Sequence, residues 1–414
     1  MSYQSGPGPG TVVGELPASN PTGAPTGFGH GRPVILQVIP ELVTGGAERG
    51  CIDVAAAIAR AGGTALVASA GGPMARELER YGARHLTLPL ASKNPFTIWR
   101  NAARLAAEIR ARGVNLIHAR SRAPAWSAML AAKRCGIPFV TTVHAPYHFK
   151  GRLKLRYNSV MAAGDRVIAI SEFIYRHVQQ TYGVGDDRLR LVHRGIDMVA
   201  FAPERLSQER VATLARRWNL PEHQRIVLLP GRLTRWKGHA VLLRALAKLG
   251  RKDVRALLVG SDQGRRHYRD ELEALATELG LQGQVTIGDH CNDMAAAYFL
   301  ADVVVSASTE PEAFGRVIVE AQAMGRPVIV SAIGAVAETV VAGETGLVVE
   351  ADNPDALAEA LGTVLALDPL ERKAIGQDGI RFVRERFTRE RMCAETLAVY
   401  GELLGGRNAD PVTA

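Results

Sequence analysis

The chain has 414 residues, of which 47% are hydrophobic, and its formal net charge is +9. This length suits two domains of about 150–200 residues each, and the apolar content is sufficient for two cores. The four cysteines lie far apart without a CxxC pair, so neither a disulfide framework nor a zinc site is expected; they are Cys51, Cys135, Cys291 and Cys393.

The chain begins with residues 1–31, which are rich in Gly, Pro, Ser and Thr and contain no Lys or Arg, so we predict a disordered tail. From residue 32 to residue 200, short β-branched runs alternate with Ala-rich segments of helical periodicity. This alternation predicts βαβ units around a buried parallel sheet. The expected strands are residues 34–39, 64–68, 114–117, 139–143 and 166–170.

The pattern pauses at residues 201–224, a polar, Arg-rich segment that we predict to be a linker helix. Residues 225–382 are expected to form a second doubly wound α/β domain, followed by a C-terminal helix at 383–405 and a tail at 406–414. The strands predicted in it are residues 226–229, 254–259, 285–287, 302–306, 327–330 and 347–349. Such sheets bind ligands at the carboxyl ends of their strands, so two facing domains create a cleft between them.

A glycine pair follows the first expected strand. The sequence there is Pro40-Glu-Leu-Val-Thr-Gly-Gly-Ala-Glu-Arg49, and a helix is expected to begin just after Gly45 and Gly46. A helix N-terminus offers free N–H groups and a positive dipole end to an anion, although a plain strand-to-helix turn is the alternative. The segment lacks the G-x-G-x-x-G pattern, which disfavours a nicotinamide or flavin enzyme.

Two histidines end strands of the first domain, and a basic segment follows the second of them. His144 directly follows strand 139–143 and should face the cleft, whereas we expect His118 to lie behind the site or on the acceptor side. The basic segment interleaves two leucines with cations and is either a solvated face or a docking site for anionic lipid. Its cations are Lys150, Arg152, Lys154 and Arg156.

Cations follow the first strand of the second domain. This strand ends in Leu229-Pro-Gly-Arg-Leu-Thr-Arg-Trp-Lys-Gly238, which places Arg232 and Lys237 at its carboxyl end beside Gly231. A bidentate guanidinium and a mobile ammonium together can neutralise a diphosphate, and a solvated basic loop is the alternative.

Two carboxylates follow strand 302–306. We predict Glu312 in the loop and Glu320 in the second turn of the next helix. An ionised Glu320 can accept both hydroxyls of a ribose, and Glu312 can accept sugar hydroxyls and favour positive charge at an anomeric carbon. Helix-capping acids are the alternative. The backbone N–H groups expected to face a sugar or phosphate are those of Phe314, Gly315 and Arg316.

These segments resemble a known family. Glu312 and Glu320, with seven residues between them, match the E-x7-E signature of retaining GT-B glycosyltransferases, and the surrounding Glu-Ala-Phe-Gly-x4-Glu-Ala resembles glycosyltransferase family 4. The resemblance runs from about residue 33 to residue 404. Gly231-Arg232 and Lys237-Gly238 resemble the family's diphosphate site, and Gly45–Arg49 resembles its phosphate loop. Thr142-Val-His144 resembles the segment whose histidine contacts the donor sugar. Ala169–Ser171 and Arg194–Asp197 also fit the family pattern.

The resemblance implies a GT-B fold: two facing Rossmann-like domains with an interdomain cleft, and a last helix that returns to the first domain. It implies retaining transfer of a sugar from a nucleoside-diphosphate donor, UDP or GDP, to a glycan or lipid-linked acceptor in lipopolysaccharide, capsule or other cell-surface glycan synthesis. It also implies a cytoplasmic enzyme, peripheral at the inner face of the membrane. The implied catalytic residues are Glu312, Lys237, Arg232 and His144, and the donor-binding residues are Gly45, Gly46, Gly231, Phe314, Gly315, Arg316 and Glu320.

No D-x-D motif is present, so we expect Arg232, Lys237 and the helix N-termini to replace a metal, with no cofactor. Three departures from the family pattern leave the donor open: Arg194 in place of Asn, Gly260-Ser-Asp262 in place of Gly-x-Gly, and Arg316 in place of an aliphatic residue. The alternatives are a nucleotide-sugar epimerase and a non-catalytic sugar-nucleotide-binding protein. Nucleic-acid binding is not expected, because no aromatic residues interleave the cations.

Overall fold

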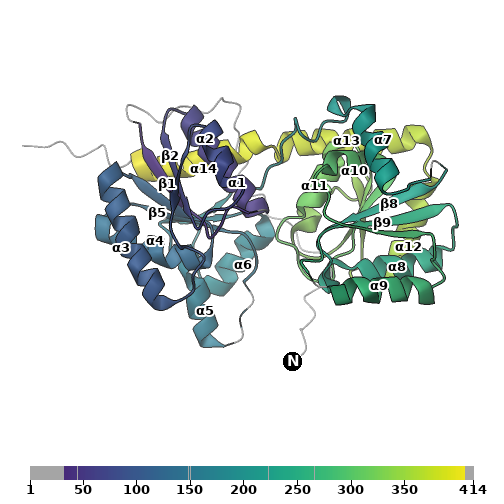
Figure 1. Ribbon diagram of the computed structural model, residues 1–414, viewed down its shortest axis with the longest axis horizontal. Coiled ribbons are helices and arrows are strands. Elements are labelled where there is room, and N and C mark those ends of the chain that lie inside the picture. Colours follow the sequence, from purple (N-terminus) through teal and green to yellow (C-terminus); the bar gives the residue numbers. More distant parts are fainter. Residues whose placement is uncertain are drawn as a thin grey trace, which may run out of the picture.

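The computed structural model describes residues 32–405 apart from residues 44, 148, 150, 222 and 265. It consists of two α/β domains side by side, the first drawn in purple to teal and the second mainly in green (Figure 1). The prediction of two Rossmann-like domains is therefore confirmed. The expected tails at 1–31 and 406–414, and Lys150 of the basic segment, lie outside the described residues.

The first domain is built on a seven-stranded parallel sheet in the order β3-β2-β1-β4-β5-β6-β7. The interior strand at residues 34–38 shows why these residues form a buried sheet: Ile35 packs into the core on one face, and Leu36 into the core on the other. The strands are β1 Val34–Val38, β2 Thr64–Ser69, β3 Arg84–Thr87, β4 Leu116–Ala119, β5 Phe139–Val143, β6 Arg166–Ala169 and β7 Leu189–Leu191.

Helices cover both faces of this sheet, and local signals set their ends. Asn94 caps the helix that follows it by accepting the N–H groups of Phe96 and Thr97, and Gly113 ends the same helix in the left-handed conformation. The helices are α1 Gly46–Arg60, α2 Ala75–Arg80, α3 Pro95–Arg112, α4 Arg122–Cys135, α5 Arg152–Asn158 and α6 Glu172–Tyr182.

The second domain repeats this plan with a six-stranded parallel sheet in the order β10-β9-β8-β11-β12-β13. Its strands are β8 Arg225–Pro230, β9 Val254–Val259, β10 Val285–Gly288, β11 Val303–Ser306, β12 Val328–Ser331 and β13 Gly346–Val349. Its helices are α7 Gln208–Arg217, α8 His239–Leu249, α9 Arg266–Glu278, α10 Met294–Leu300, α11 Arg316–Ala323, α12 Pro354–Ala366 and α13 Pro369–Arg386.

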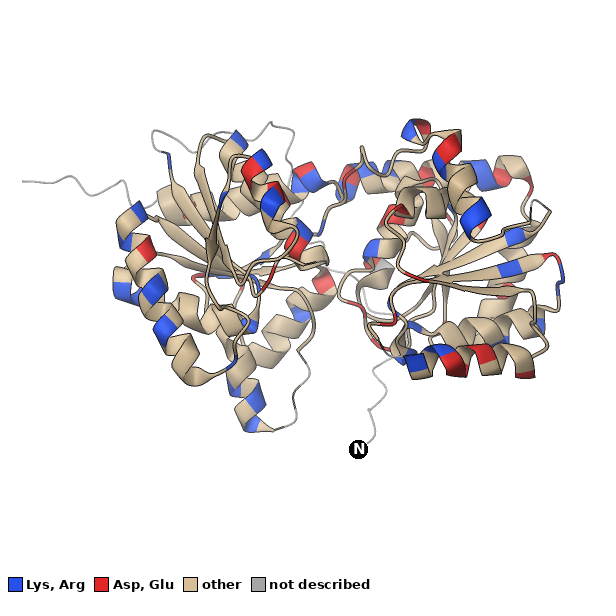
Figure 2. Ribbon diagram, in the orientation of Figure 1, with Lys and Arg blue, Asp and Glu red and all other residues tan. Residues whose placement is uncertain are grey.

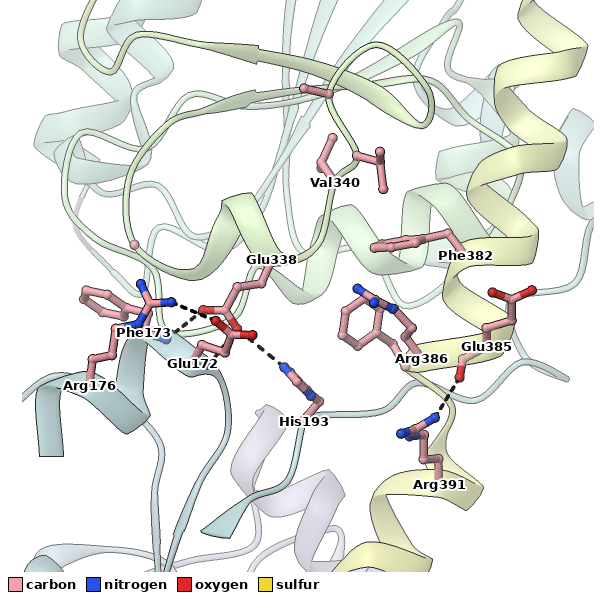
Figure 3. Close-up of a pocket in the computed structure, with 14 residues that line it drawn as sticks. Glu172, Phe173, Arg176, His193, Glu338, Val340, Phe382, Glu385, Arg386 and Arg391 are labelled. Atoms are coloured by element: carbon pink, nitrogen blue, oxygen red, sulfur yellow. Dashed lines mark hydrogen bonds and ion pairs between the residues drawn. The ribbon is translucent and has the colours of Figure 1, made fainter. Parts of the chain in front are cut away.

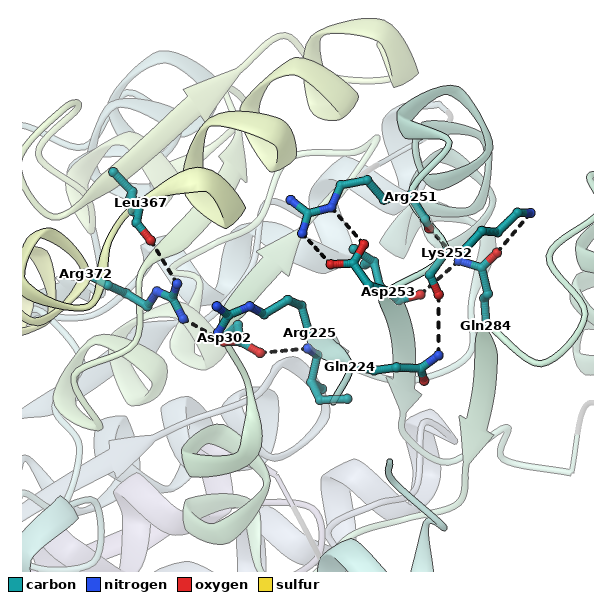
Figure 4. Close-up of polar contacts among 11 residues, drawn as sticks. Gln224, Arg225, Arg251, Lys252, Asp253, Gln284, Asp302, Leu367 and Arg372 are labelled. Carbon is teal, nitrogen blue, oxygen red and sulfur yellow. Dashed lines mark hydrogen bonds and ion pairs between the residues drawn. The ribbon is translucent and has the colours of Figure 1, made fainter. Parts of the chain in front are cut away.

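The amino ends of these strands carry paired ions. Asp302, just before β11, accepts hydrogen bonds from Arg225 at the start of β8 and from Arg372 of α13 (Figure 4). It also accepts the backbone N–H of Ile226 at 2.8 Å. This end of the sheet is therefore tied together by its own side chains, and the carboxyl ends of the strands are the ends available to a ligand.

Strands β3 and β7 were not predicted, and two longer segments differ from the prediction in detail. Residues 201–224, expected as a linker helix, do contain a helix, α7, but it packs on the second domain: Leu214 and Trp218 join its core, and Arg210 pairs with Asp293 at 2.7 Å. The helix expected at 383–405 is divided instead. Helix α13 continues to Arg386, and a separate helix, α14, spans Arg389–Leu404. The helix is interrupted there because the chain crosses from the second domain to the first.

Helix α14 lies along the first domain, where it packs beside α1 (yellow in Figure 1). The two chain crossings meet between the domains, because Ile196 donates its N–H to Phe387 and accepts that of Arg389. Gly195 permits this approach: a Cβ there would lie 2.1 Å from the carbonyl oxygen of Thr388. Ile196 and Phe387 also share one apolar core cluster with strands of the first sheet and with Val319 and Ala323 of α11.

Candidate functional site

The glycine turn of the first domain meets the second domain at Gly46. A Cβ on Gly46 would lie 2.4 Å from Nη1 of Arg194 and 3.7 Å from Nη1 of Arg316, which begins α11. A side chain at this position would therefore displace the Arg194 guanidinium. Gly45 directly precedes α1 as its N-cap. The N-terminus of α1 and the N-terminus of α11 thus face one another across the cleft between the domains.

Lys237 and Glu312 form an ion pair on the second-domain side of this cleft. Nζ of Lys237 donates to Oε1 of Glu312 at 2.8 Å, and the two side chains are only 11% and 10% exposed. Ser308 and Ser306 donate to the same oxygen at 2.5 and 3.2 Å. No described residue donates to Oε2 of Glu312, so one carboxylate oxygen is held by three donors and the other is left for a ligand.

The turn after β8 brings Lys237 to this position. It is a short 3₁₀ helix, Arg235–Lys237, which ends at Gly238 with a φ of 72°. A Cβ on Gly238 would lie 1.7 Å from the carbonyl oxygen of Ala307, so only glycine lets this turn approach the end of β11. Gly231 adjoins the Lys237 side chain: its Cβ position is 3.4 Å from Cδ. The cation and the carboxylate therefore meet because two neighbouring strands end side by side.

The environment of Glu312 keeps it ionised. Burial acts to raise its pKa, but Lys237 and the hydroxyls of Ser308 and Ser306 outweigh burial and lower the pKa below the ordinary carboxyl value. The group is therefore a carboxylate at neutral pH. It can accept hydrogen bonds or stabilise positive charge, but it cannot donate a proton.

Glu320 is held by two donors in the same wall of the cleft. Tyr298 of α10 donates its hydroxyl to Oε2 at 2.9 Å, and Nε of Arg316 donates to Oε1 at 2.6 Å. Burial and the carboxylate raise the pKa of Tyr298 well above its ordinary value, so its hydroxyl remains a donor. A carboxylate has about four acceptor positions, so Glu320 retains capacity for the hydroxyls of a ligand.

Two other predicted residues occupy different surroundings. The ring of Phe314 is buried and packs on Phe387 with a centroid distance of 5.5 Å, so only its backbone can face the cleft. Gly315 is the N-cap of α11 with a φ of 81°. Arg232 is exposed after β8, and the described residues give its side chain no ion-pair partner. Arg232 and Lys237 thus belong to the same turn after β8, but only Lys237 has a carboxylate partner among the described residues.

The histidines of the first domain have distinct surroundings. Nδ1 of His144 lies 2.9 Å from Nη2 of Arg194. Burial, Arg316 and Arg120 lower the pKa of Arg194 to about 9. His118 is fully buried between the hydroxyls of Tyr400, at 2.6 Å, and Thr142, at 2.7 Å. It therefore connects α14 to the sheet and lies behind the cleft.

A contact between the domains involves residues that the sequence did not single out. Glu338 of the second domain accepts the N–H groups of Glu172 and Phe173 at the start of α6, each at 2.7 Å (Figure 3). His193 lies 3.5 Å from the same carboxylate. These residues line a cavity of ≈ 980 Å³ whose other walls include Phe382 and Arg391. Glu338 thus caps a helix of one domain from the other.

The basic segment forms the exposed helix α5, which carries blue bands and no red in Figure 2. Leu153 on this helix is 86% exposed and Phe149 just before it is 41% exposed. None of the helices in the described part of the chain is long and apolar enough to cross a membrane. Among the same residues, no three His, Cys, Asp or Glu side chains gather in an arrangement that could hold a metal ion.

The sequence of this chain matches two family models and several curated proteins. Residues 44–199 match the family model described as Glycosyltransferase Family 4, and residues 211–381 match the model described as Glycosyl transferases group 1. A curated relative, the D-inositol 3-phosphate glycosyltransferase of Xylanimonas cellulosilytica, is 32% identical over 295 residues. That match covers 68% of this chain and 70% of the relative.

Solved structures with the same architecture include a glycosyltransferase from Rickettsia africae. It is 36% identical with a TM-score of 0.84, and the match covers 91% of this chain and 99% of that one. Anabaena HepE in complex with UDP and glucose is 25% identical with a TM-score of 0.78, covering 89% of this chain and 100% of the other. Both align over nearly the whole described chain, across both domains.

Proposed function

The chain belongs to the family 4 glycosyltransferases, and from that premise we propose that it transfers a sugar, with retention at the anomeric carbon, from a nucleoside-diphosphate sugar to a glycan or lipid-linked acceptor. Its two domains have the GT-B fold. The observation that carries the proposal is the Lys237–Glu312 pair at the cleft, whose side chains are only 11% and 10% exposed.

Each part of the site has a role in this proposal. Lys237 and Arg232 stabilise the diphosphate as its charge grows in the transition state. The free oxygen of Glu312 accepts a sugar hydroxyl and favours positive charge at the anomeric carbon. Glu320 accepts the ribose hydroxyls. Gly45, Gly46, Gly231 and the N–H groups of Phe314, Gly315 and Arg316 bring backbone close to the phosphates and the sugar, and His144 donates to the sugar.

A thermal-shift screen with UDP, GDP and ADP sugars tests donor binding, because a ligand that binds only the folded state raises the Tm. We expect one base to give a clear rise, with donor hydrolysis that stops in Glu312→Gln. Release of an epimerised nucleotide sugar without an acceptor would instead support the epimerase. Binding without any turnover would support the non-catalytic alternative. No rise with any base would contradict the proposal.

The acceptor has two candidates. The resemblance favours an acceptor of lipopolysaccharide, capsule or another cell-surface glycan. The Xylanimonas relative is called a D-inositol 3-phosphate glycosyltransferase, which favours a small phosphorylated polyol. Once the donor is known, product formation with inositol 3-phosphate and with lipid-linked glycan acceptors is compared directly. The anomeric configuration of the product, measured by NMR, tests retention in the same experiment.

We also propose that α5 docks on the inner face of the cytoplasmic membrane. Arg152, Lys154 and Arg156 supply charge on this helix, and the exposed Leu153 supplies an apolar contact. Lys150 completes the basic segment in the sequence. At low salt, the protein should sediment with anionic vesicles more than with neutral ones. A variant with Arg152, Lys154 and Arg156 changed to Gln should lose that difference, and equal sedimentation of the wild type would argue against docking.

Transfer is proposed to be independent of a metal, because Lys237, Arg232 and the N-terminus of α11 supply positive charge at the diphosphate. Turnover should therefore continue when EDTA is added. If a chelator abolished turnover and magnesium restored it, the diphosphate role assigned to these cations would be wrong.

A further inference from the structure

The ring of His144 is fixed at one nitrogen by an arginine. His144 directly follows β5, and Arg194 follows β7; Nη2 of Arg194 lies 2.9 Å from Nδ1 of His144. A guanidinium has only N–H donors, so Nδ1 must be the acceptor. A neutral imidazole carries its single proton on the other nitrogen. The contact with Arg194 therefore selects the tautomer with N–H at Nε2.

The second ring nitrogen has no partner of its own. Nε2 of His144 is buried and has no hydrogen-bond partner in the described part of the chain, and the same is true of Nη2 of Arg120. Both residues line a cavity of ≈ 20 Å³ together with Arg194, which is room for about one or two water-sized atoms. Both spare groups are donors in this tautomer, so the cavity suits an acceptor atom such as an oxygen.

The surroundings also keep the ring uncharged. Burial lowers the pKa of His144 well below its ordinary value, and Arg194, Arg120 and His118 lower it further. Arg120 approaches from the end of β4, His118 from within β4 and Arg194 from the end of β7. None of the charged or titratable groups that shift this pKa is a carboxylate. Protonation at Nδ1 would in addition break the contact with Arg194.

We propose that Arg194 is a positioning residue that holds His144 as the neutral Nε2–H tautomer and so makes the ring an obligate hydrogen-bond donor to an oxygen of the transferred sugar. The proposal rests on the proposed function for the identity of the sugar, but not for the state of the ring. An asparagine at position 194, the residue typical of the family, can donate or accept and would leave both tautomers accessible. His144 in this chain therefore orients its ligand and does not act as a base.

Ring-¹⁵N-labelled histidine in the full-length protein tests the state of the ring by NMR without any substrate, with His144→Gln used to assign the signal. The wild type should show Nδ1 unprotonated and Nε2 protonated, unchanged from pH 6 to pH 8. Arg194→Asn should mix the two tautomers or let the ring titrate. Arg194→Lys, another donor without acceptor atoms, should restore the wild-type pattern. Arg176→Asn, at a side chain 65% exposed, is the matched control and should have no effect.

Kinetics then measure the consequence. Arg194→Asn should lower kcat/KM by about tenfold, as expected for a misdirected buried hydrogen bond, and Arg194→Lys should recover most of it. A wild-type ring protonated at Nδ1, a ring that titrates between pH 6 and pH 8, or an unchanged spectrum in Arg194→Asn would overturn the proposal. If no sugar nucleotide is turned over, the proposed function fails instead, and the NMR result stands on its own.

Discussion

The two walls of the cleft arrange their charges differently. On the second-domain wall the carboxylates Glu312 and Glu320 each have an opposite partner, Lys237 and Arg316 respectively. On the first-domain wall Arg194 is hydrogen-bonded to the neutral His144, and Arg120 has an Nη2 without a hydrogen-bond partner in the described chain. One wall is balanced before a ligand binds, and the other holds donors that lack acceptors.

This difference indicates what each wall contributes. A balanced pair keeps its geometry in the empty protein and costs little to reorganise when a diphosphate arrives. Spare buried donors are costly while they are unpaired, and an oxygen-rich ligand relieves that cost. We therefore expect Lys237 and Glu320 of the second-domain wall to set leaving-group stabilisation and nucleotide affinity, and the spare donors of the first-domain wall to act on the sugar together with Glu312.

Removing Lys237 from the second-domain wall should have the largest effect on activity and stability. Lys237→Ala should lower kcat by about 10²–10³, because it removes a preorganised charge from the developing diphosphate. It also leaves Glu312 buried without its counter-ion, which should cost about 3–5 kcal/mol of stability. Steady-state kinetics and urea unfolding measure the two effects separately.

Two variants separate charge in the site from charge in general. Lys237→Met combined with Glu312→Gln removes both members of the pair, so stability should recover while activity stays low. Lys248→Ala removes an exposed lysine that pairs with Asp355 and should change neither property. A Lys237→Ala enzyme with unchanged kcat would refute the role of Lys237.

Acid should weaken the Lys237–Glu312 ion pair. The folded protein lowers the pKa of Glu312, so the pair contributes stability above the ordinary carboxyl pKa of ~4.3, and this contribution is lost as the pH falls through the lowered value. Urea unfolding of the wild type and the Lys237→Met/Glu312→Gln variant, measured from pH 6 to pH 3, should therefore show the wild type losing more stability. Parallel curves would contradict the assignment.

The contact between the walls should show an intermediate effect. Glu338→Ala removes the acceptor for two N–H groups of α6 and should weaken the interdomain contact by about 1.5–3 kcal/mol. We expect kcat/KM to fall about tenfold and small-angle X-ray scattering to report a more open average shape. Glu338→Gln keeps one acceptor oxygen, so its kcat/KM and its scattering should lie between those of the wild type and of Glu338→Ala. Unchanged scattering and kinetics in Glu338→Ala would show that this contact does not hold the domains.

The sequence predicts best those features that depend on short, continuous segments. Buried strands are continuous apolar runs, and the segments that follow them carry Lys237, Glu312 and Glu320, so the fold and the meeting of Lys237 with Glu312 could be anticipated. Edge strand β3, with two exposed residues, has no such run and was missed. Contacts between distant segments were missed for a different reason: the bonds from Glu338 to α6 span 165 and 166 residues, and no local pattern encodes them.

The difference between local patterns and long-range contacts also explains two predictions that differ in part from the structure. Phe314 sits inside a motif whose backbone was expected at the cleft, but its ring fills the core beside Phe387, a contact that only the returning chain creates. The break between α13 and α14 at Phe387 likewise follows from the crossing between domains, since Ile196 pairs with the chain there. Propensity within residues 383–405 alone favours one continuous helix.

The smallest effect tests whether the balanced wall acts on the ribose. Tyr298→Phe removes one of the two donors that hold Glu320 and should cost about 1 kcal/mol, or about fivefold in the KM for the donor, with kcat nearly unchanged. Tyr268→Phe is a matched control, because the described residues provide no hydrogen-bond partner for that buried hydroxyl. A fall in kcat at constant KM would place Glu320 nearer the reacting bond than the ribose.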